Sequence, residues 1–545
     1  MTPDVTTAAA GTASLVQSVD WVAIAPPLIA AALALVVLLA DLFLPPARKP
    51  LLGWITIGGL VAALASLTPL RTGSRSTFCL TANPDACSYT VDQFAFVIQV
   101  LVLGGALLTA LLSMKDTEED LPAGEFWFLL LSSAAGAALL PAARDLATLV
   151  VALEVASLPA FALVGLKRGD RLSSEAALKF FLSSVTATAV MLLGVSFVYA
   201  ATGTLHLTEL ATELATVPGQ LGTVAETGVV LTLVGFAFKT AAAPFHFWVP
   251  DTYVGAPLPI AAYLSVVGKA VGFSGLILVT VVAFPAYADV WGPALAVFAA
   301  LTMTLGNAAA LRQSATRAHS AVRLLAWSSV GQAGYLLVPI AAAAYSSDSK
   351  VGATVAYALM YAVVNLGAFA VAVLVARSKP LNRLSDYRGL YAEHPLAALA
   401  LAFFLLCLAG LPPGIIGLFA KVTVFSAAVD AGLGWLAVVM AVNVVVALYY
   451  YLRWTAILFR PAEVATTAET AATAETAATA DPAEAVEAAD ERPPAQAATS
   501  GGAPRPARPR IPAPLAVAIG LTALGGVVLS GLPQLALHFA TVTLF

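Results

Sequence analysis

Apolar runs of twenty or more residues recur along this chain from Trp21 to the C-terminus. A run of that length spans the ~30 Å hydrocarbon core of a bilayer as an α-helix, which satisfies its own backbone hydrogen bonds there. The chain is 60% hydrophobic and only 11% charged, whereas soluble domains are about 25% charged. The sequence therefore predicts an all-α polytopic membrane protein.

Hydropathy divides the chain into about fourteen transmembrane helices. The first twenty residues contain no Lys or Arg and so lack the positive region of a secretory signal peptide, and we expect the first helix to be retained. The expected helices cover residues 21–44, 51–70, 92–114, 124–143, 145–166, 174–202, 223–243, 257–284, 290–311, 320–344, 351–376, 394–429, 433–459 and 512–540.

The distribution of positive charge predicts the orientation of these helices. With the N-terminus outside, the inner loops and helix ends hold 19 of the 27 Lys and Arg residues, and the outer ones hold four. Cytoplasmic loops carry the excess of positive charge in membrane proteins. We therefore expect a multi-pass protein of a bacterial plasma membrane with both termini outside the cytoplasm.

The chain has three cysteines, and this orientation gives two of them an outer position. Cys79 and Cys87 fall in the second loop, outside the cytoplasm, where a disulfide persists. Two free thiols are the alternative interpretation. Cys407 lies in an apolar helix and is interpreted as a packing residue.

Residues 461–510 differ in composition from the rest of the chain. They repeat Ala, Thr, Glu and Pro, and they contain almost no large apolar side chain. Such a segment cannot bury enough surface to become ordered. We expect a disordered inner loop there, followed by a C-terminal helical region at 511–545.

The remaining four lysines, Lys179, Lys239, Lys269 and Lys421, lie within predicted spans, as does Glu154. A charge at that depth costs at least ~2.5–3.5 kcal/mol, and a lysine that takes up and releases a proton is one physical reason to retain it. Glu154 and Lys269 lie roughly 14 and 18 Å from their helix ends, near the midplane. Lys179 lies only about five residues from the inner end of its helix and is able to snorkel. We interpret all five as candidates for a proton path.

Two predicted spans contain helix breaks. Pro244 interrupts the seventh span in FKTAAAPFHFWVPD, and Pro412 and Pro413 interrupt the twelfth in AGLPPGIIGLFAK. A proline inside a helix removes one N–H donor and clashes with the carbonyl four residues earlier. The carbonyls expected to lose their partners are those of Thr240, Leu408 and Ala409.

The two breaks occupy equivalent places in two blocks of five helices. The first three helices (1–123) are followed by helices four to eight (124–284) and nine to thirteen (290–460). An odd number of helices reverses the direction of the second block, and each block has its broken helix in fourth place with a lysine near the break. This pattern predicts an inverted-repeat transporter. Unrelated kinked helices are the alternative.

Six motifs together resemble one known family. They are RDLATLVVALEVASLPAFALVG (144–165), EAALKFFL (175–182), FAFKTAAAPFHFWVPDTYVGAP (236–257), RLLAWSSVGQAGYLLV (323–338), NLGAFAV (365–371) and GLPPGIIGLFAKV (410–422). Over roughly residues 20–460 the chain resembles the antiporter-like membrane subunits of respiratory complex I, the NADH-quinone oxidoreductase. That family is homologous to subunits of multisubunit Na⁺/H⁺ antiporters.

The resemblance implies roles for individual residues. Glu154 is similar to the fifth-helix glutamate that pairs with the seventh-helix lysine, here Lys239. Lys269 resembles the eighth-helix lysine that passes protons along the central axis, and Lys421 resembles the twelfth-helix lysine of the exit half-channel. His246 lies in the family run APFHFWVPD, as a relay member or as a structural hydrogen-bonding residue.

Other positions refine the resemblance. Val254 stands where the family often has a polar residue, which argues against proton access there, and the 461–510 insertion is not a family feature. Asp251 is interpreted as a cap or loop ligand at the inner surface. Fourteen helices without a long amphipathic C-terminal helix, and a lysine rather than a glutamate at position 421, favour one of the antiporter-like subunits over the others.

The sequence contains no cysteine cluster with iron–sulfur spacing, no glycine-rich nucleotide loop after a strand and no pair of haem-ligand histidines. We therefore expect a proton-translocating subunit that itself binds no cofactor or metal, while the whole complex uses NADH and quinone. The expected partners are other antiporter-like and small membrane subunits and the lipid bilayer, and not nucleic acid. The alternatives are a subunit of a cation/proton antiporter without a redox partner, and a scaffold subunit whose lysines form buried ion pairs.

Overall fold

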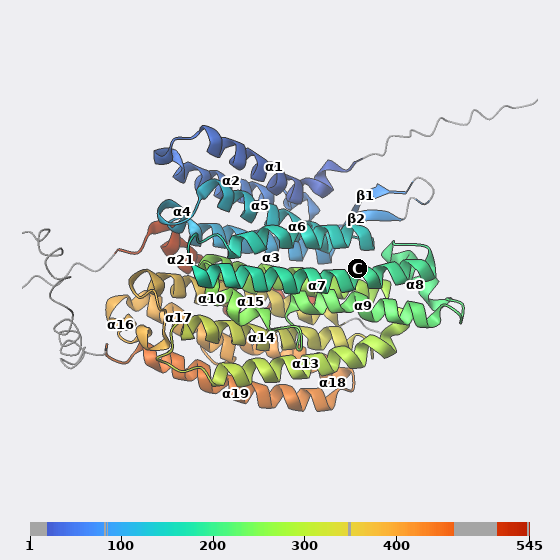
Figure 1. Cartoon of the computed structure of the whole chain (residues 1–545). Helices are drawn as coiled ribbons and strands as arrows, with labels where there is room; N and C mark the ends of the chain where they lie inside the picture. Colours follow the sequence, from blue (N-terminus) through green and yellow to red (C-terminus); the bar gives the residue numbers. More distant parts are fainter. Residues whose placement is uncertain are drawn as a thin grey trace, which may run out of the picture.

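The computed structural model describes residues 19–80, 83, 86–346, 350–462, 510–541 and 544. Its long helices run side by side along one direction, and a β-hairpin lies at one end of the bundle (Figure 1). Within these residues, thirteen helices are long and apolar enough to cross a membrane. A further crossing is divided into two shorter helices, α17 and α18. The prediction of an all-α polytopic membrane protein is confirmed.

The elements before the first predicted block are two strands and four α-helices, with two short 3₁₀ helices at Pro46–Arg48 and Thr68–Leu70. They are α1 (Trp21–Phe43), α2 (Pro50–Ala65), β1 (Arg75–Cys79), β2 (Cys87–Val91), α3 (Gln93–Ser113) and the short α4 (Asp116–Glu119).

The first predicted block contains the seventh and eighth spans, both of which are interrupted. Its elements are α5 (Ala123–Leu139), α6 (Leu146–Val164), α7 (Arg171–Thr202), the amphipathic α8 (Leu207–Ala215), α9 (Gly222–Thr240), α10 (Trp248–Gly255), α11 (Leu258–Tyr263), the π-helix η4 (Leu264–Gly268), α12 (Lys269–Ile277) and the π-helix η5 (Leu278–Ala283).

The second predicted block and the C-terminal region follow. Their helices are α13 (Ala288–Leu311), α14 (Ser320–Ala342), α15 (Val351–Ser378), α16 (Leu390–Glu393), α17 (Pro395–Ala409), α18 (Ile415–Asp430), α19 (Gly434–Leu458), α21 (Ala513–Gly531) and α22 (Gln534–Thr541).

Aspartate side chains fix where several helices begin. Asp92 accepts a hydrogen bond from the backbone N–H of Ala95 at the start of α3, and Asp145 accepts one from Thr148 at the start of α6. Asp20 and Asp170 cap α1 and α7 in the same way. Because the first N–H groups of a helix have no partner within it, such caps set the boundary between loop and helix.

The centre of the bundle is formed by the helices of the eighth, tenth and eleventh spans. Within their apolar windows, 83%, 94% and 89% of the residues are buried, compared with 28% in α21 and 39% in α7. Lys269 begins α12, within the eighth span, so it lies on the central axis of the bundle.

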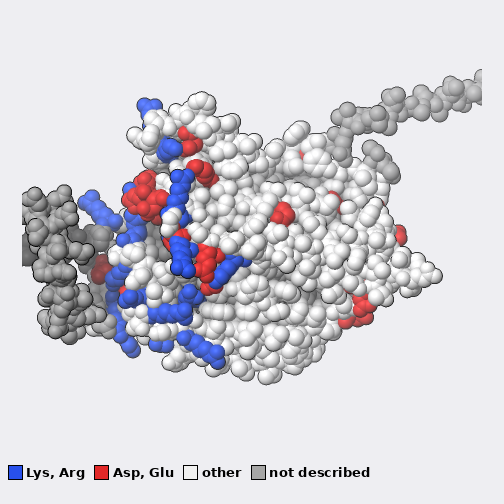
Figure 2. Space-filling model, viewed as in Figure 1, with Lys and Arg blue, Asp and Glu red and all other residues white. Residues whose placement is uncertain are grey.

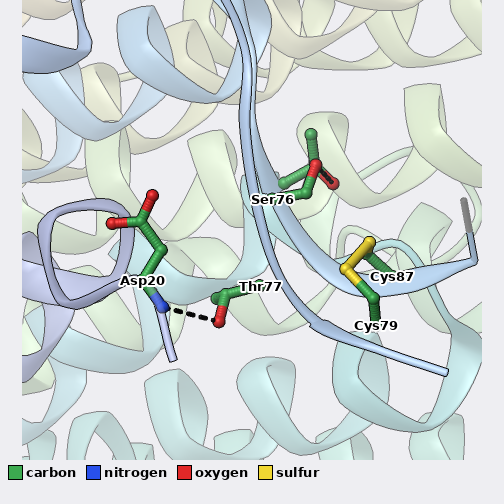
Figure 3. Close-up of a disulfide and its surroundings, with 6 residues drawn as sticks. Asp20, Ser76, Thr77, Cys79 and Cys87 are labelled. Atoms are coloured by element: carbon green, nitrogen blue, oxygen red, sulfur yellow. Dashed lines mark hydrogen bonds between the residues drawn. A yellow bond between two sulfur atoms is a disulfide. The ribbon is translucent and has the colours of Figure 1, made fainter. Parts of the chain in front are cut away.

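Cys79 and Cys87 form a disulfide across the hairpin (Figure 3). They are paired residues in the antiparallel β1–β2 register. Thr77 Oγ1 accepts a hydrogen bond from the Asp20 backbone N–H at 3.1 Å, which ties the hairpin to the start of α1. The disulfide interpretation is thus the one that the structure supports. Cys407 is a buried free thiol, as expected.

Two of the expected helices are wrong in their extent. The seventh helix ends at Thr240 rather than at 243, since Pro244 cannot continue it, and the chain becomes helical again at Trp248. The last helix, expected over 512–540, is interrupted between Gly531 and Gln534, where Pro533 lies. The hairpin and α8 were not expected at all. The expected disordered loop lies outside the described residues, apart from 461, 462 and 510.

Candidate functional site

Lys239 is held among hydroxyl and aromatic groups in the last turn of α9. Its side chain is buried, and its Nζ donates a hydrogen bond to Ser184 Oγ on α7 at 2.9 Å. The same ammonium lies 5.0 Å from the ring centre of Phe161 and 5.4 Å from that of Phe180. Aromatic faces attract cations at such distances. The site therefore accommodates a charged lysine without a direct carboxylate partner.

Glu154, the expected partner of Lys239, forms no ion pair among the described residues. Its Oε1 accepts a hydrogen bond from Thr188 Oγ1 on α7 at 2.8 Å. Thr188 lies four residues after Ser184, which is about one helical turn. The structure thus brings Glu154 and Lys239 to neighbouring hydroxyl groups of α7, and the direct pair that the resemblance implies is not formed.

The first break carries a left-handed helix end. Ala241 has φ +63°, and the Ala242 N–H donates to the Ala237 carbonyl at 2.9 Å. The Trp248 indole N–H, from α10, donates to the Phe238 carbonyl at 3.1 Å. This is a Schellman-type end, which satisfies carbonyls that the helix cannot. The side chain of Trp248, which follows the break, thus satisfies a carbonyl at the end of α9.

His246 lies within this first break and is half-buried. Its ring centre is 5.6 Å from that of Trp327 on α14. The structure places it at the break and not in contact with Lys239. Within the described residues, no group of three or more His, Cys, Asp or Glu side chains is arranged to hold a metal ion.

The second break has the same backbone pattern but a different cap. Gly410 has φ +84°, and the Leu411 N–H donates to the Leu406 carbonyl at 2.9 Å. Lys421 Nζ donates to the carbonyls of Leu408 and Ala409 at 2.8 and 2.7 Å. These are two of the carbonyls that the prolines were expected to leave without partners. The ammonium lies at the C-terminal end of α17, where a helix dipole favours positive charge.

The two lysines are therefore not placed alike on their helices. Lys239 precedes its break, in the last turn of α9, whereas Lys421 follows its break and reaches back from α18. Both ammonium groups nevertheless lie beside a helix end that the break creates. Sequence spacing alone indicated a lysine near each break but not this difference.

Lys269 links the central helices of the bundle. It is 2% exposed, directly follows the π-helix η4, and its Nζ donates to the Ser329 carbonyl on α14. The Ser329 hydroxyl is hydrogen-bonded to Tyr361 OH on α15 at 2.8 Å. Single π-helical turns occur frequently at functional sites. No feature of the apolar sequence around Lys269 indicates this turn.

Two small cavities lie along the line of lysines. The first, the Lys239 cavity, is lined by Lys239 and also by Ser133, Tyr263 and Gly268, the residue before Lys269. The second, the Lys421 cavity, has a lining that includes Lys421, Gln332, Tyr357 and Tyr361. Each has room for about one water molecule. Tyr361 belongs to the Lys421 cavity and bonds Ser329, so polar groups extend from Lys269 to Lys421.

A comparison with known protein families identifies this arrangement. Residues 143–447 match the family described as NADH:quinone oxidoreductase/Mrp antiporter, transmembrane. This range contains both helix breaks and all the candidate residues. The chain belongs to this family.

Curated relatives are similar over almost the whole chain. A Streptomyces griseus protein named NADH-quinone oxidoreductase subunit N 2 is 74% identical over 537 residues, which are 98% of this chain and 96% of the relative. A Salinispora tropica protein named NADH-quinone oxidoreductase subunit N is 45% identical over 472 residues, covering 83% of this chain and 88% of the relative.

Solved structures share the fold. A chain in respiratory complex I from Thermus thermophilus with bound aureothin is 31% identical, with a TM-score of 0.70 and coverage of 94% of this chain and 98% of that chain. A chain in the Mrp complex from a Dietzia species has a TM-score of 0.73 at 22% identity, covering 94% of this chain and 96% of that chain. The second likeness concerns the fold alone. Both neighbours are parts of multisubunit complexes.

Lys179 differs from the three buried lysines of this chain in its exposure and its partners. It is exposed, and its Nζ lies 2.7 Å from Glu175 and 2.9 Å from Asp251. Asp251 also lies 3.6 Å from Arg323 on α14. The structure therefore places Lys179 in a group of ion pairs, and Asp251 acts there as a charged partner rather than as a cap.

The hydroxyl groups beside the lysines were missed from the sequence. Ser184 and Thr188 on α7, and Ser329 and Tyr361 in the centre, contact the charged groups or their acceptors. Serine and threonine in an apolar helix commonly bond their own backbone, as Ser157 does here to Leu153. Their presence in a span is therefore a weak signal. Only the packing of the helices shows whether such a hydroxyl bonds its own backbone or a charged group on another helix.

Proposed function

We propose that this chain is subunit N of a bacterial NADH-quinone oxidoreductase and that it translocates protons while NADH and quinone react elsewhere in the complex. The 74% identity to a protein with that name supports the assignment. Lysine at position 421, where subunit M typically has glutamate, argues against M.

The observation that carries the function is the set of buried lysines, each beside polar groups. We propose a path in which Glu154 and Lys239 exchange protons with Lys269, and Lys269 with Lys421. A hydroxyl group both donates and accepts hydrogen bonds, so Ser184, like Ser329, is able to hand on a proton. Water in the two cavities would connect the parts of the path that the side chains do not.

Lys421 is suited to accept and release a proton. Its two hydrogen bonds to Leu408 and Ala409 use two N–H donors. A neutral amine retains two N–H groups and a lone pair, while an ammonium has three donors. Both protonation states therefore keep the two carbonyl bonds, and the third position of the nitrogen exchanges the proton with the Lys421 cavity.

The similar helix ends at Ala241 and Gly410 support two inverted halves, 124–284 and 290–460, each with one broken helix. In an inverted repeat the two halves have opposite orientations, so their broken helices lie in similar surroundings but face opposite sides of the membrane. We propose that the first half forms the entry from the inside and the second half forms the exit. His246 is assigned to the inner approach, in the first break.

The charge distribution supports an orientation with both termini outside. On the face shown in Figure 2, Lys and Arg gather at one end of the molecule. The disulfide-bonded hairpin lies at the other end in the same view (Figure 1). Positive charge is retained on the cytoplasmic side and disulfides persist on the opposite side.

Lys239→Ala tests the proposed function in inverted membrane vesicles. We expect NADH-driven proton uptake to fall by about tenfold or more, as for the loss of a proton-transferring group, while the complex still assembles. Lys115→Ala is the matched control, since Lys115 is a lysine outside the spans that pairs with Glu118. Normal uptake in Lys239→Ala would support a scaffold instead.

Purification in mild detergent separates the two transport functions. Co-purification with flavin- and iron–sulfur-containing subunits is the expected result. Sodium-dependent antiport by a complex without those subunits would support the cation/proton antiporter, whose fold this chain shares at 22% identity.

A further inference from the structure

The short helix α10 begins directly after the break that separates it from Lys239 at the end of α9. It has eight residues, and an isolated helix of that length is not stable in water, so its contacts fix its position. Its Trp248 caps the Phe238 carbonyl and stacks on Phe180 with a centroid distance of 4.4 Å. The Phe180 ring in turn lies 5.4 Å from Lys239 Nζ. A displacement of α10 would therefore reach Lys239 through two contacts.

One carboxylate of α10 is bonded to both neighbouring helices. Asp251 Oδ2 accepts a hydrogen bond from Lys179 Nζ on α7 at 2.9 Å. Its Oδ1 lies 3.6 Å from Arg323 Nη1 on α14, a side chain that is only 22% exposed. Asp251 is thus the point at which α7, α10 and α14 are joined by charge.

We infer that Asp251 is a positioning residue for the proton path, and that Lys179 is the cation that clamps it rather than a proton relay. The clamp holds α10 against α7, so that Trp248 closes the break and Phe180 lies against Lys239. This inference rests on the proposed function. Under this inference Lys179 positions α10 and does not itself transfer protons.

Glu175 gives the clamp a second position. It lies one turn before Lys179 on α7, and its Oε1 is 2.7 Å from Lys179 Nζ. If α10 moves away, Lys179 keeps a carboxylate partner on its own helix. The clamp is therefore able to open without leaving an unpaired charge at the membrane edge, where such a charge is costly.

A clamp and a relay differ in what they need from Lys179. A relay must release its proton, whereas a clamp needs only a permanent positive charge. Arginine keeps its charge in proteins and also forms ion pairs with carboxylates. Lys179→Arg therefore preserves a clamp and abolishes a relay, and Lys179→Met abolishes both.

The experiment measures proton uptake per NADH oxidised in inverted vesicles that contain the whole complex. We expect Asp251→Asn and Lys179→Met to lower this ratio by about two- to fivefold, the effect of one partly exposed ion pair on the position of α10. Lys179→Arg should have the same ratio of protons to NADH as the unmodified protein. Lys115→Met is the matched control, because it also removes a lysine ion pair, with Glu118 and Glu119, and that pair includes no residue of the clamp.

Two results would overturn the inference. One is a ratio as low in Lys179→Arg as in Lys179→Met, which identifies a relay. The other is a normal ratio in Asp251→Asn. If Asp251→Asn lowers the amount of complex, Asp251→Glu, which keeps the charge, must restore both the amount and the ratio. Lys239→Ala is measured in parallel. Normal proton uptake in Lys239→Ala would contradict the proposed function. Loss of uptake in Lys239→Ala together with a normal ratio in Asp251→Asn would contradict the clamp alone.

Discussion

Ser184 and Thr188 lie one turn apart on α7, and each is bonded to one of the two charged groups of the first half. Ser184 accepts from Lys239 at 2.9 Å, and Thr188 donates to Glu154 at 2.8 Å. The two charges are thus connected through α7. A small shift of this helix would change both hydrogen bonds together, which offers a physical means of coupling the two protonation states.

Ser184→Ala tests this connection. It removes the hydroxyl partner of a buried ammonium, and an unsatisfied buried group costs about 1–3 kcal/mol. We expect NADH-driven proton uptake to fall several-fold. Combining it with Thr188→Val should lower uptake no further than the more severe single variant, because groups in one chain of bonds are not additive.

The control for this prediction is Thr186→Ala, since the Thr186 hydroxyl donates to the Leu182 carbonyl of its own helix. Its uptake should stay normal. Additive losses in the Ser184 and Thr188 double variant would show that the two residues act separately.

Gly410→Ala tests the position of Lys421. Both Gly410 and Gly432 have positive φ, and alanine there costs about 1–2 kcal/mol at either position. A Cβ on Gly410 would also lie 3.3 Å from Lys421 Nζ, whereas one on Gly432 would meet nothing within 4 Å. We therefore expect both variants to lower the melting temperature of the complex, and only Gly410→Ala to lower proton uptake. Equal uptake by the two variants would argue against a role for Lys421 at the break.

The sequence predicts the parts of this site that depend on strong local rules. Hydropathy locates the spans, and the prolines locate the breaks and the carbonyls of Leu408 and Ala409 that need new partners. That Lys421 reaches back to supply them depends on the path of the chain between α17 and α18. No spacing rule contains that information.

Other features depend on tertiary packing or on weak local signals. The π-helix before Lys269 has the same apolar composition as the α-helix around it. In the hairpin, only β2 (CSYTV) alternates apolar and polar residues, and β1 (RSTFC) does not, so the sequence signal for a pair of strands is incomplete. Lys179 and Lys239 look alike as lysines in apolar runs, and only the depth and the neighbours of each side chain separate them.

Asp116 gives the fold a pH-dependent stability. It lies in α4, outside the spans, and burial raises its pKa to about 6, against the opposing effect of Arg377. An unfolded aspartate has a pKa of about 3.9. Because the folded state binds this proton more tightly, the stability from Asp116 is complete below about pH 4 and is lost as the pH rises through about 6.

Asp116→Asn should therefore stabilise the protein at high pH. The neutral amide avoids the buried charge, and we expect a gain of about 3 kcal/mol at pH 8 and about half of that at pH 5. Thermal unfolding of the detergent-purified complex at the two pH values measures this. Asp120→Asn, at an exposed neighbouring position, controls for the loss of one negative charge. A gain that does not depend on pH would contradict the explanation.

The disulfide allows the orientation to be tested with the native cysteines. Cys79 and Cys87 are bonded to each other, and Cys407, the third cysteine of the chain, is 2% exposed. After a membrane-impermeant reductant, an impermeant maleimide should label two cysteines in right-side-out vesicles and none in sealed inverted ones. Without reductant there should be no labelling, and a double variant, Cys79→Ser with Cys87→Ser, should stay unlabelled throughout. Labelling confined to inverted vesicles would reverse the orientation, and with it the assignment of entry and exit to the two halves.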